Sequence, residues 1–157
     1  MRRKDREVID NTEILSILKR SNTIRIGMYY DEFPYIVPVS FGFEIIDQKP
    51  VVYFHSATQG MKIELLARNP NVCVEADNFF KVQKTSHGIT ARYESIIGFG
   101  KCEEVYNKEE IIKGLRLILE HYEYGDYPLE RCGEIINVKI YRIILDKITG
   151  KLNPVEE

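Results

Sequence analysis

Residues 51–62 combine side chains that could bind an anion. An apolar, β-prone run ends at His55, a polar turn follows, and the composition after that turn favours a helix. The first N–H groups of a helix have no partner within the helix and lie at the positive end of its dipole. A hydroxyl (Ser56 or Thr58), Gly60 and the cation of Lys62 accompany them here. This pattern indicates a phosphate-binding turn; the alternative is an ordinary capped helix after a strand.

Composition sets limits on what the chain can be. It has 157 residues, of which 44% are hydrophobic, with 22 basic and 24 acidic residues and a net charge of −2. We expect one domain over residues 1–157, because this length suffices for its own core. The balanced charge argues against a general nucleic-acid binder, and no apolar run approaches the roughly 20 residues that a membrane span needs.

The cysteines and histidines do not form a recognisable metal or disulfide pattern. Three cysteines are widely spaced, none belongs to a CxxC pair, and the three histidines are scattered. This pattern argues against a disulfide framework and against a structural zinc site. It predicts reduced cysteines in a cytoplasmic protein.

Turn and breaker residues divide the chain into short segments. We expect helices at about residues 10–20, 61–68 and 107–122, and strands at 23–30, 35–46, 51–55, 71–77, 91–105 and 135–148. Residues 78–90 are expected to form a loop or an irregular hairpin, and residues 123–133 a tyrosine-rich loop. Six strands joined mostly by short turns favour an antiparallel barrel over a doubly wound sheet. The glycine-rich turn of a dinucleotide-binding fold is absent after the first strand.

Four motifs in register carry a resemblance to a known family. They are Pro34–Phe43, Tyr53–Ala57 with Gly60 and Lys62, Asn69–Cys73, and Tyr93–Gly100. Together they resemble the flavin-binding split barrels related to pyridoxamine phosphate oxidase, and most closely the nitroimidazole-reductase (Nim-type) branch. The match covers about residues 5–151. It implies a mainly β fold with helices, namely a six-stranded antiparallel split β-barrel, which forms a homodimer and holds FMN at the subunit interface.

The resemblance also assigns roles to residues. It implies that the FMN phosphate lies at the turn formed by His55, Ser56, Ala57, Gly60 and Lys62. It implies that the isoalloxazine ring lies along the backbone of Pro38, Val39, Ser40 and Phe41. It further implies that Glu94, Ser95 and Ile97 approach the flavin across the dimer interface. The alternative for Ser40 and Ser95 is that their hydroxyls satisfy backbone groups at strand ends.

His55 has two further interpretations. The resemblance implies a position at the flavin, where a side chain that titrates near neutral pH could transfer a proton, so His55 is the candidate catalytic residue. The alternative is a histidine that hydrogen-bonds backbone at the end of a strand.

Three functions are compatible with these features. The first is a flavin-dependent reductase that takes hydride from NADH or NADPH and passes electrons to a nitro compound, a quinone or a similar small acceptor. The second is a flavin-binding module without robust turnover, and it shares every binding residue with the first. In the third the barrel holds haem, with His55 as ligand, or a deazaflavin. We expect the reductase.

Overall fold

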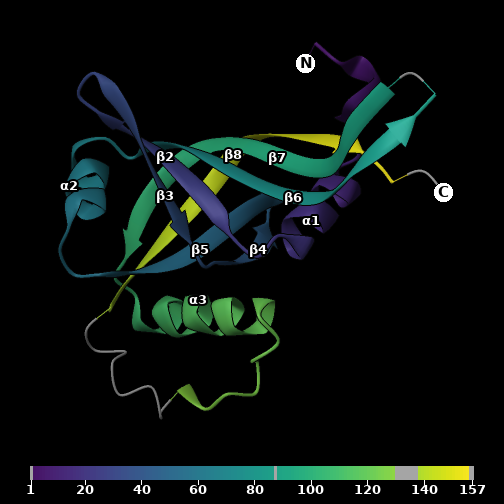
Figure 1. Ribbon diagram of the computed structural model, residues 1–157. Helices are drawn as coiled ribbons and strands as arrows, with labels where there is room; N and C mark the ends of the chain where they lie inside the picture. Colours follow the sequence, from purple (N-terminus) through teal and green to yellow (C-terminus); the bar gives the residue numbers. More distant parts are fainter. Residues whose placement is uncertain (1, 87, 130–137, 156–157) are drawn as a thin grey trace.

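The computed structural model describes residues 2–86, 88–129 and 138–155 (Figure 1). Its elements are η1 (Lys4–Arg6), β1 (Glu7–Val8), α1 (Asn11–Arg20), β2 (Ile24–Tyr30), β3 (Phe33–Val39), β4 (Gly42–Ile46), β5 (Lys49–Ala57), α2 (Met61–Arg68), β6 (Asn71–Thr85), β7 (Gly88–Val105), α3 (Lys108–His121) and β8 (Val138–Asn153). The strands form one antiparallel sheet in the order β3-β2-β6-β7-β8-β5-β4, and β1 pairs with β8.

The chain itself connects the two edges of this sheet. β3 is one edge and ends at Val39, whereas β4 is the other edge and begins at Gly42, so Ser40 and Phe41 carry the chain from edge to edge. We call residues 38–41 the crossover. In the described residues no ladder joins β3 to β4, so the sheet curls without closing. This arrangement confirms the predicted split barrel.

Two strand predictions are corrected. The strand expected at residues 35–46 is two strands, because the chain changes edges at Ser40 and Phe41; with the short β1, this raises the number of strands from six to eight. Within the predicted loop, residues 78–85 and 88–90 are paired as extensions of β6 and β7, with one register shift between Phe79 and Lys81. Adjacent phenylalanines at that shift interrupt the two-residue alternation by which a strand is recognised.

The helices agree with the sequence prediction because their ends are set locally. The Asp10 side chain accepts a hydrogen bond from the Thr12 N–H at 2.9 Å, and the Asn107 side chain accepts one from the Glu110 N–H at 3.0 Å. The last strand extends from Val138 to Asn153. Residues 130–137, which include the predicted start of that strand and part of the tyrosine-rich loop, lie outside the described residues.

Two apolar cores lie on opposite faces of β5. The larger fills the barrel and includes Phe54 together with Leu18 of α1 and Leu66 of α2. The smaller lies beneath α3 and includes Tyr53 and Ile140. Figure 1 shows α3 as a separate layer next to β4 and β5. Burial on both faces explains why β5 is apolar over successive residues instead of alternating.

Gly42 marks the place where α3 comes closest to the sheet. A Cβ atom at this position would overlap the backbone of Leu117 and Ile118. We therefore expect Gly42→Ala to lower the free energy of unfolding by about 3 kcal/mol, near the upper end for overpacking. Urea denaturation followed by circular dichroism measures the effect. Gly27→Ala is the matched control, because a Cβ there makes only ordinary contacts with Cys73. Similar losses in both variants would contradict the close approach of α3.

Candidate cofactor-binding site

The turn between β5 and α2 has an open helix start. α2 begins after its N-cap residue Gly60, whose φ of 131° lies in the region that favours glycine. Glycine has no side chain that could cap the helix, so the N-cap residue makes no side-chain hydrogen bond to it. No atom lies within 4 Å of the position that a Cβ of Gly60 would occupy. Ser56 at the end of β5 is buried. The predicted phosphate turn is therefore open above Gly60 and has a hydroxyl beside it.

Lys62 is a half-buried cation at this helix start. Its Nζ atom lies 5.3 Å from the centroid of the Phe54 ring, over the barrel core. Burial lowers the pKa of the Lys62 ammonium, and the Cys102 thiol offsets part of that effect. No carboxylate in the described part of the chain contributes to its pKa. A partly desolvated ammonium without a carboxylate partner is stabilised by an anionic ligand.

His55 and Ser56 point to opposite faces of β5, since successive side chains of a strand alternate. His55 pairs with Ile140 of β8 on the side where α3 packs, and the residue is exposed to solvent. Partial burial of the ring lowers the pKa of His55, and the positive charge of Lys62 lowers it further. Lys62 therefore acts electrostatically on His55 although Ser56 and His55 face different ways.

A bound phosphate should reverse the shift of the His55 pKa. In the ligand-free protein we expect the His55 pKa to lie below 6.5, so the imidazole is neutral at pH 7. A dianionic phosphate next to Lys62 favours the protonated imidazole, so FMN should raise the His55 pKa, whereas riboflavin should leave it unchanged. Titration of the imidazole C–H signals by NMR measures both values. The same His55 pKa with FMN and with riboflavin would contradict phosphate binding at this turn.

The crossover lies beside the end of β5. Gly42 pairs with Tyr53, so the residues before Gly42 run toward the end of β5 that carries His55 and Ser56. Within the crossover Pro38 and Ser40 are exposed, Val39 is half-buried, and Phe41 is buried. The structure thus brings the predicted ring-binding backbone to the same end of the barrel as the predicted phosphate turn.

Two residues at the end of α3, His121 and Tyr122, contact Phe41 of the crossover. The Phe41 ring centroid lies 4.2 Å from that of His121, whose Nε2 donates to the Ser21 carbonyl at 2.8 Å. The Tyr122 hydroxyl accepts from the Phe41 N–H at 3.2 Å and donates to the Asn22 carbonyl at 2.7 Å. The Phe41 N–H is therefore already hydrogen-bonded to the Tyr122 hydroxyl. Sequence analysis missed these supports because Phe41 and Tyr122 are 81 residues apart in the chain.

Glu94 faces the interior of the protein. Its Oε1 accepts from Arg20 Nε at 2.9 Å and from Asn78 at 2.8 Å, and its Oε2 accepts from Arg20 Nη2 at 2.7 Å. Burial opposes ionisation of this carboxyl, but the hydrogen bonds from Arg20 and Asn78 outweigh burial and lower the pKa of Glu94. Within one protomer, the Glu94 carboxylate therefore serves the α1–β6–β7 junction.

Ser95 and Ile97 project from the other face of β7. Ile97 pairs with Glu75, Glu75 with Arg25, and Arg25 with Pro38, so Ile97 and Pro38 share one row across the sheet. Three strand spacings separate them, which is roughly 14 Å. One protomer alone does not bring Ile97 to the crossover, so the contact of Ser95 and Ile97 with a flavin stays a prediction that requires a second chain.

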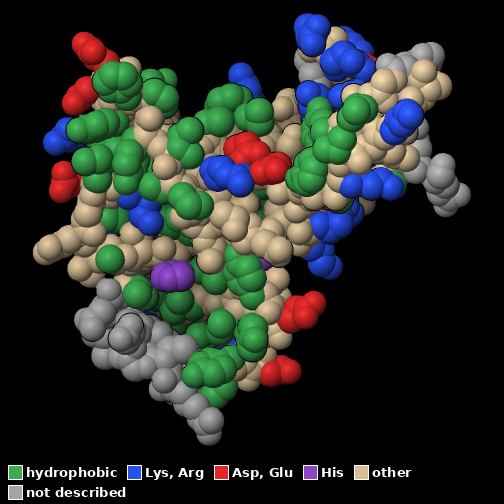
Figure 2. Space-filling view, in the orientation of Figure 1, with side chains coloured by type: hydrophobic (Ala, Val, Ile, Leu, Met, Phe, Trp, Pro, Cys, Tyr) green, Lys and Arg blue, Asp and Glu red, His purple; other side chains and the backbone are tan. Residues whose placement is uncertain are grey.

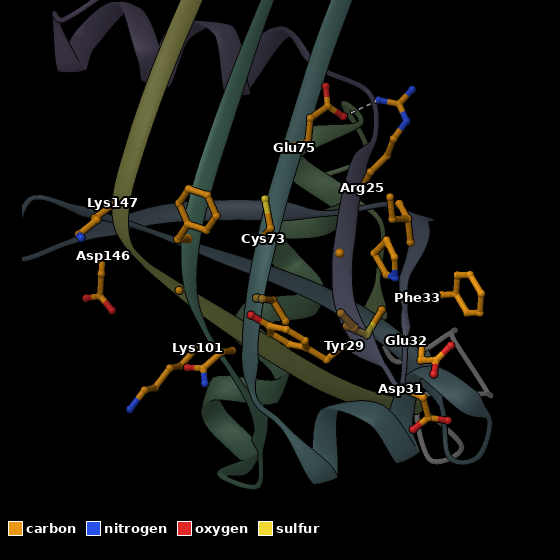
Figure 3. Close-up of a pocket in the computed structure, with 18 residues that line it drawn as sticks. Arg25, Tyr29, Asp31, Glu32, Phe33, Cys73, Glu75, Lys101, Asp146 and Lys147 are labelled. Atoms are coloured by element: carbon orange, nitrogen blue, oxygen red, sulfur yellow. Dashed lines mark hydrogen bonds and ion pairs between the residues drawn. The ribbon is translucent and has the colours of Figure 1, made fainter. Parts of the chain in front are cut away.

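A pocket of about 950 Å³ opens on this same face of the sheet (Figure 3). Tyr29, Phe33 and Phe99 are among the residues that line it. Charged residues also line it, with Asp31 and Glu32 from the β2–β3 turn and Lys101, Asp146 and Lys147 from β7 and β8. None of the residues of the β5–α2 turn lines this pocket. The pocket and the predicted phosphate turn are therefore separate features.

Comparison with known proteins identifies the family. The sequence model of the family described as "Pyridoxamine 5'-phosphate oxidase" matches residues 10–152 of this chain. The chain is similar to a proposed 5-nitroimidazole antibiotic resistance protein from Bacteroides thetaiotaomicron, with 32% identity, a TM-score of 0.81, and coverage of 92% of this chain and 85% of that chain. No curated protein matches it. The chain belongs to the pyridoxamine 5'-phosphate oxidase family and, within that family, to the branch similar to nitroimidazole resistance proteins.

Two more distant structures share the fold. The flavocytochrome Anf3 from Azotobacter vinelandii has a TM-score of 0.78 at 16% identity, with coverage of 100% of this chain and 75% of that chain. The FAD binding protein from Mycobacterium smegmatis has a TM-score of 0.64 at 21% identity, with coverage of 94% of this chain and 98% of that chain.

Within the described residues, none of the helices combines the length and apolarity that a membrane span requires.

Proposed function

We propose that the chain is an FMN-binding protein and that FMN binds at the β5–α2 turn and along the crossover. The observation that carries this proposal is Lys62, a half-buried ammonium without a carboxylate partner among the described residues, at a helix start that its N-cap residue leaves uncapped. A phosphate monoester, with a charge of roughly −1.5 to −2 near neutral pH, complements such a site. One cation at one helix start fits a single terminal phosphate, which supports FMN over FAD.

The similarity to known proteins supports a flavin at this site. The family takes its name from an oxidase of pyridoxamine 5'-phosphate, and one protein with the same fold is described as FAD-binding. Ser40 of the crossover is exposed, so its backbone could address the polar edge of a flavin ring, and Tyr122 and His121 contact the neighbouring Phe41. These residues would orient the flavin, which when bound supplies hydride and electron transfer.

We further propose that the protein is a reductase that uses NADH or NADPH and a small acceptor such as a nitro compound or a quinone. Neither described cysteine is an activated nucleophile: burial, aided by Glu75, raises the pKa of Cys73, and burial, aided by Glu103, raises that of Cys102 to about 12. Both thiols are therefore protonated near neutral pH. Because neither thiol is activated, we infer that the bound cofactor carries the reaction.

Both described cysteines, Cys73 and Cys102, are free, which supports the proposal that the protein acts in the cytoplasm.

Anaerobic titration of the FMN-loaded protein tests the reductase. NADH or NADPH should bleach the flavin absorbance, and a nitroaromatic or a quinone should restore it. Dithionite serves as the control that shows the bound flavin to be reducible. Bleaching by dithionite but by neither nicotinamide would favour a flavin-binding module without turnover. A Soret band in the purified protein would instead indicate haem.

We propose that the protein is a homodimer. The face of the sheet that carries Ile36, Ile97 and Phe99 exposes all three side chains, and exposed apolar residues clustered on one face mark an interaction site. Sedimentation equilibrium at micromolar concentration should give twice the chain mass of 18.4 kDa. A monomer that binds FMN under the same conditions would contradict the dimer.

A further inference from the structure

Tyr122 is held in place by the way in which α3 ends. It is the C-cap residue of the helix, and Glu123 after it has a φ of 67°, in the left-handed region. The Glu123 N–H donates to the Glu120 carbonyl at 3.1 Å, and the Tyr124 N–H donates to the Leu119 carbonyl at 2.8 Å. These two bonds are those of a Schellman motif. The backbone position of Tyr122 is therefore set by the helix.

The Tyr122 hydroxyl lies where the β2–β3 ladder ends. The last pair of that ladder is Ile24 with Val39, so Asn22, two residues before Ile24, is opposite Phe41, two residues after Val39. The hydroxyl donates to the Asn22 carbonyl at 2.7 Å and accepts from the Phe41 N–H at 3.2 Å. It is therefore inserted at the place where a direct hydrogen bond from Phe41 to Asn22 would continue the ladder.

The directions of both hydrogen bonds follow from one proton. A phenolic hydroxyl has a single proton, a carbonyl oxygen accepts, and a peptide N–H donates. The proton of the Tyr122 hydroxyl therefore points to the Asn22 carbonyl, and a lone pair faces the Phe41 N–H. The hydroxyl takes the place of a direct backbone bond at the point where the chain leaves β3 for β4.

Phe41 is also held by two further contacts. Its side chain is fully buried, and its ring centroid lies 4.2 Å from that of His121. The next residue, Gly42, lies so close to α3 that a Cβ there would overlap the helix backbone. Ser40, which precedes Phe41 and is exposed, therefore takes its position from residues that pack on α3.

The same contacts limit the backbone donors that the crossover can offer to a ligand. Pro38 has no N–H, and the Phe41 N–H is hydrogen-bonded to Tyr122. Val39 is half-buried and still belongs to the β2–β3 ladder. Ser40 is exposed and lies outside the ladders that the structure describes for β3 and β4. Among the crossover residues this leaves the Ser40 N–H to meet a ligand from solvent.

We propose that Tyr122 is a positioning residue of the flavin site, whose hydroxyl holds the crossover away from β2 and keeps the Ser40 N–H directed at the flavin ring. This inference rests on the FMN site proposed above and specifies how its ring-binding backbone is held. Tyr122 does not touch the flavin in this arrangement and acts through Phe41 and Ser40. It therefore affects the binding of the ring and not that of the phosphate.

The variant Tyr122→Phe keeps the aromatic ring and removes the hydroxyl alone. The Phe41 N–H then loses its acceptor, and the crossover can close onto Asn22. We expect the dissociation constants of FMN and riboflavin to rise by the same factor, about three- to tenfold, as for the loss of one hydrogen bond. Quenching of flavin fluorescence measures both constants.

The midpoint potential of the bound flavin gives a readout that a purely structural role would not change. Reduced flavin carries more negative charge at its polar edge than oxidised flavin, and hydrogen bonds to charged groups are stronger than those to neutral groups. In Tyr122→Phe the affinity for reduced flavin should therefore fall by about fivefold more than that for oxidised flavin, which lowers the potential. Spectroelectrochemical titration measures it.

Tyr124→Phe is the matched control. Tyr124 is 65% exposed, and Figure 2 shows apolar side chains at the surface over the segment that follows α3. Removal of the Tyr124 hydroxyl should leave both dissociation constants and the potential unchanged. A role of Tyr122 in stability alone would lower the free energy of unfolding in Tyr122→Phe without changing the potential.

Amide hydrogen exchange of the wild type provides a test that does not depend on the folding of a variant. The Phe41 amide should be protected with or without flavin. The Ser40 amide should exchange rapidly in the ligand-free protein and become protected with either FMN or riboflavin. A Ser40 amide that exchanges equally fast in the free and the flavin-bound protein would overturn the role assigned to the crossover.

Failure of the flavin site and failure of this inference are distinguishable. A wild type that does not bind FMN would overturn the proposed site and, with it, the role of Tyr122. A wild type that binds FMN, with a Tyr122→Phe variant of equal affinities and equal potential, would overturn the positioning role alone. A loss of affinity for FMN but not for riboflavin would show that Tyr122 acts on the phosphate, and would also overturn the positioning role.

Discussion

Lys62→Ala should weaken FMN binding by about tenfold or more while changing riboflavin binding little. The charge-assisted hydrogen bond of a lysine with a phosphate contributes roughly 1.5–3 kcal/mol, and each 1.4 kcal/mol corresponds to about tenfold in affinity. The Lys62 ammonium is partly buried, so solvent screens its interaction with a phosphate less than at a fully exposed site. Riboflavin lacks the phosphate and therefore reports only on the ring. Quenching of flavin fluorescence measures both dissociation constants.

A matched control separates the charge of Lys62 from its packing. Lys113 lies over the Tyr53 ring at 5.9 Å from its centroid, on α3, and is also a lysine that contacts an aromatic ring. Lys113→Ala should leave the affinity for both ligands unchanged. Equal losses of FMN and riboflavin affinity in Lys62→Ala would show that Lys62 does not contact the phosphate.

His55→Ala should lower turnover of a quinone or a nitroaromatic by on the order of a hundredfold, the lower end for loss of a general acid. The pKa of His55 is below its ordinary value in the free protein, and a bound phosphate would return it toward the neutral range in which proton transfer is efficient. His55 is exposed to solvent, so a small acceptor can reach it. Steady-state turnover of protein saturated with FMN measures the loss.

To test the prediction for His55, the effect of the substitution on turnover must be measured separately from its effect on FMN occupancy. FMN occupancy of His55→Ala should fall much less than turnover, and added imidazole should restore part of the rate. His55→Gln keeps a hydrogen-bonding side chain without the titratable group and should be as slow as His55→Ala. Turnover that falls only in proportion to FMN occupancy would show that His55 binds the cofactor and transfers no proton.

The β5–α2 turn was predictable because its determinants are contiguous in sequence. Gly60 and Lys62 follow the apolar run of β5 directly, so the strand, the turn and the helix start can be recognised without knowledge of the fold. Helix capping by Asp10 and Asn107 is local in the same way. Such features depend on residues within a few positions of one another.

The remaining features depend on contacts between distant segments. Nothing local at residues 35–46 shows that the chain leaves one sheet edge at Val39 and joins the other at Gly42, since the alternating pattern continues across the change. The partner of the Glu94 carboxylate is Arg20, 74 residues away in sequence. The exposed face of the sheet that carries Ile36 and Phe99 cannot be recognised in the sequence either, because its rows form only when β3, β2, β6, β7 and β8 are in register.

Identification of the ligand in the purified protein tests the central claim most directly. The absorption spectrum is recorded, the protein is denatured, and the released ligand is identified by mass spectrometry; any ligand-free fraction is titrated with FMN. The account predicts flavin absorbance with FMN as the released ligand, or a ligand-free fraction that binds added FMN and loses that affinity in Lys62→Ala. A colourless protein that does not bind FMN, or one that releases haem, would contradict it.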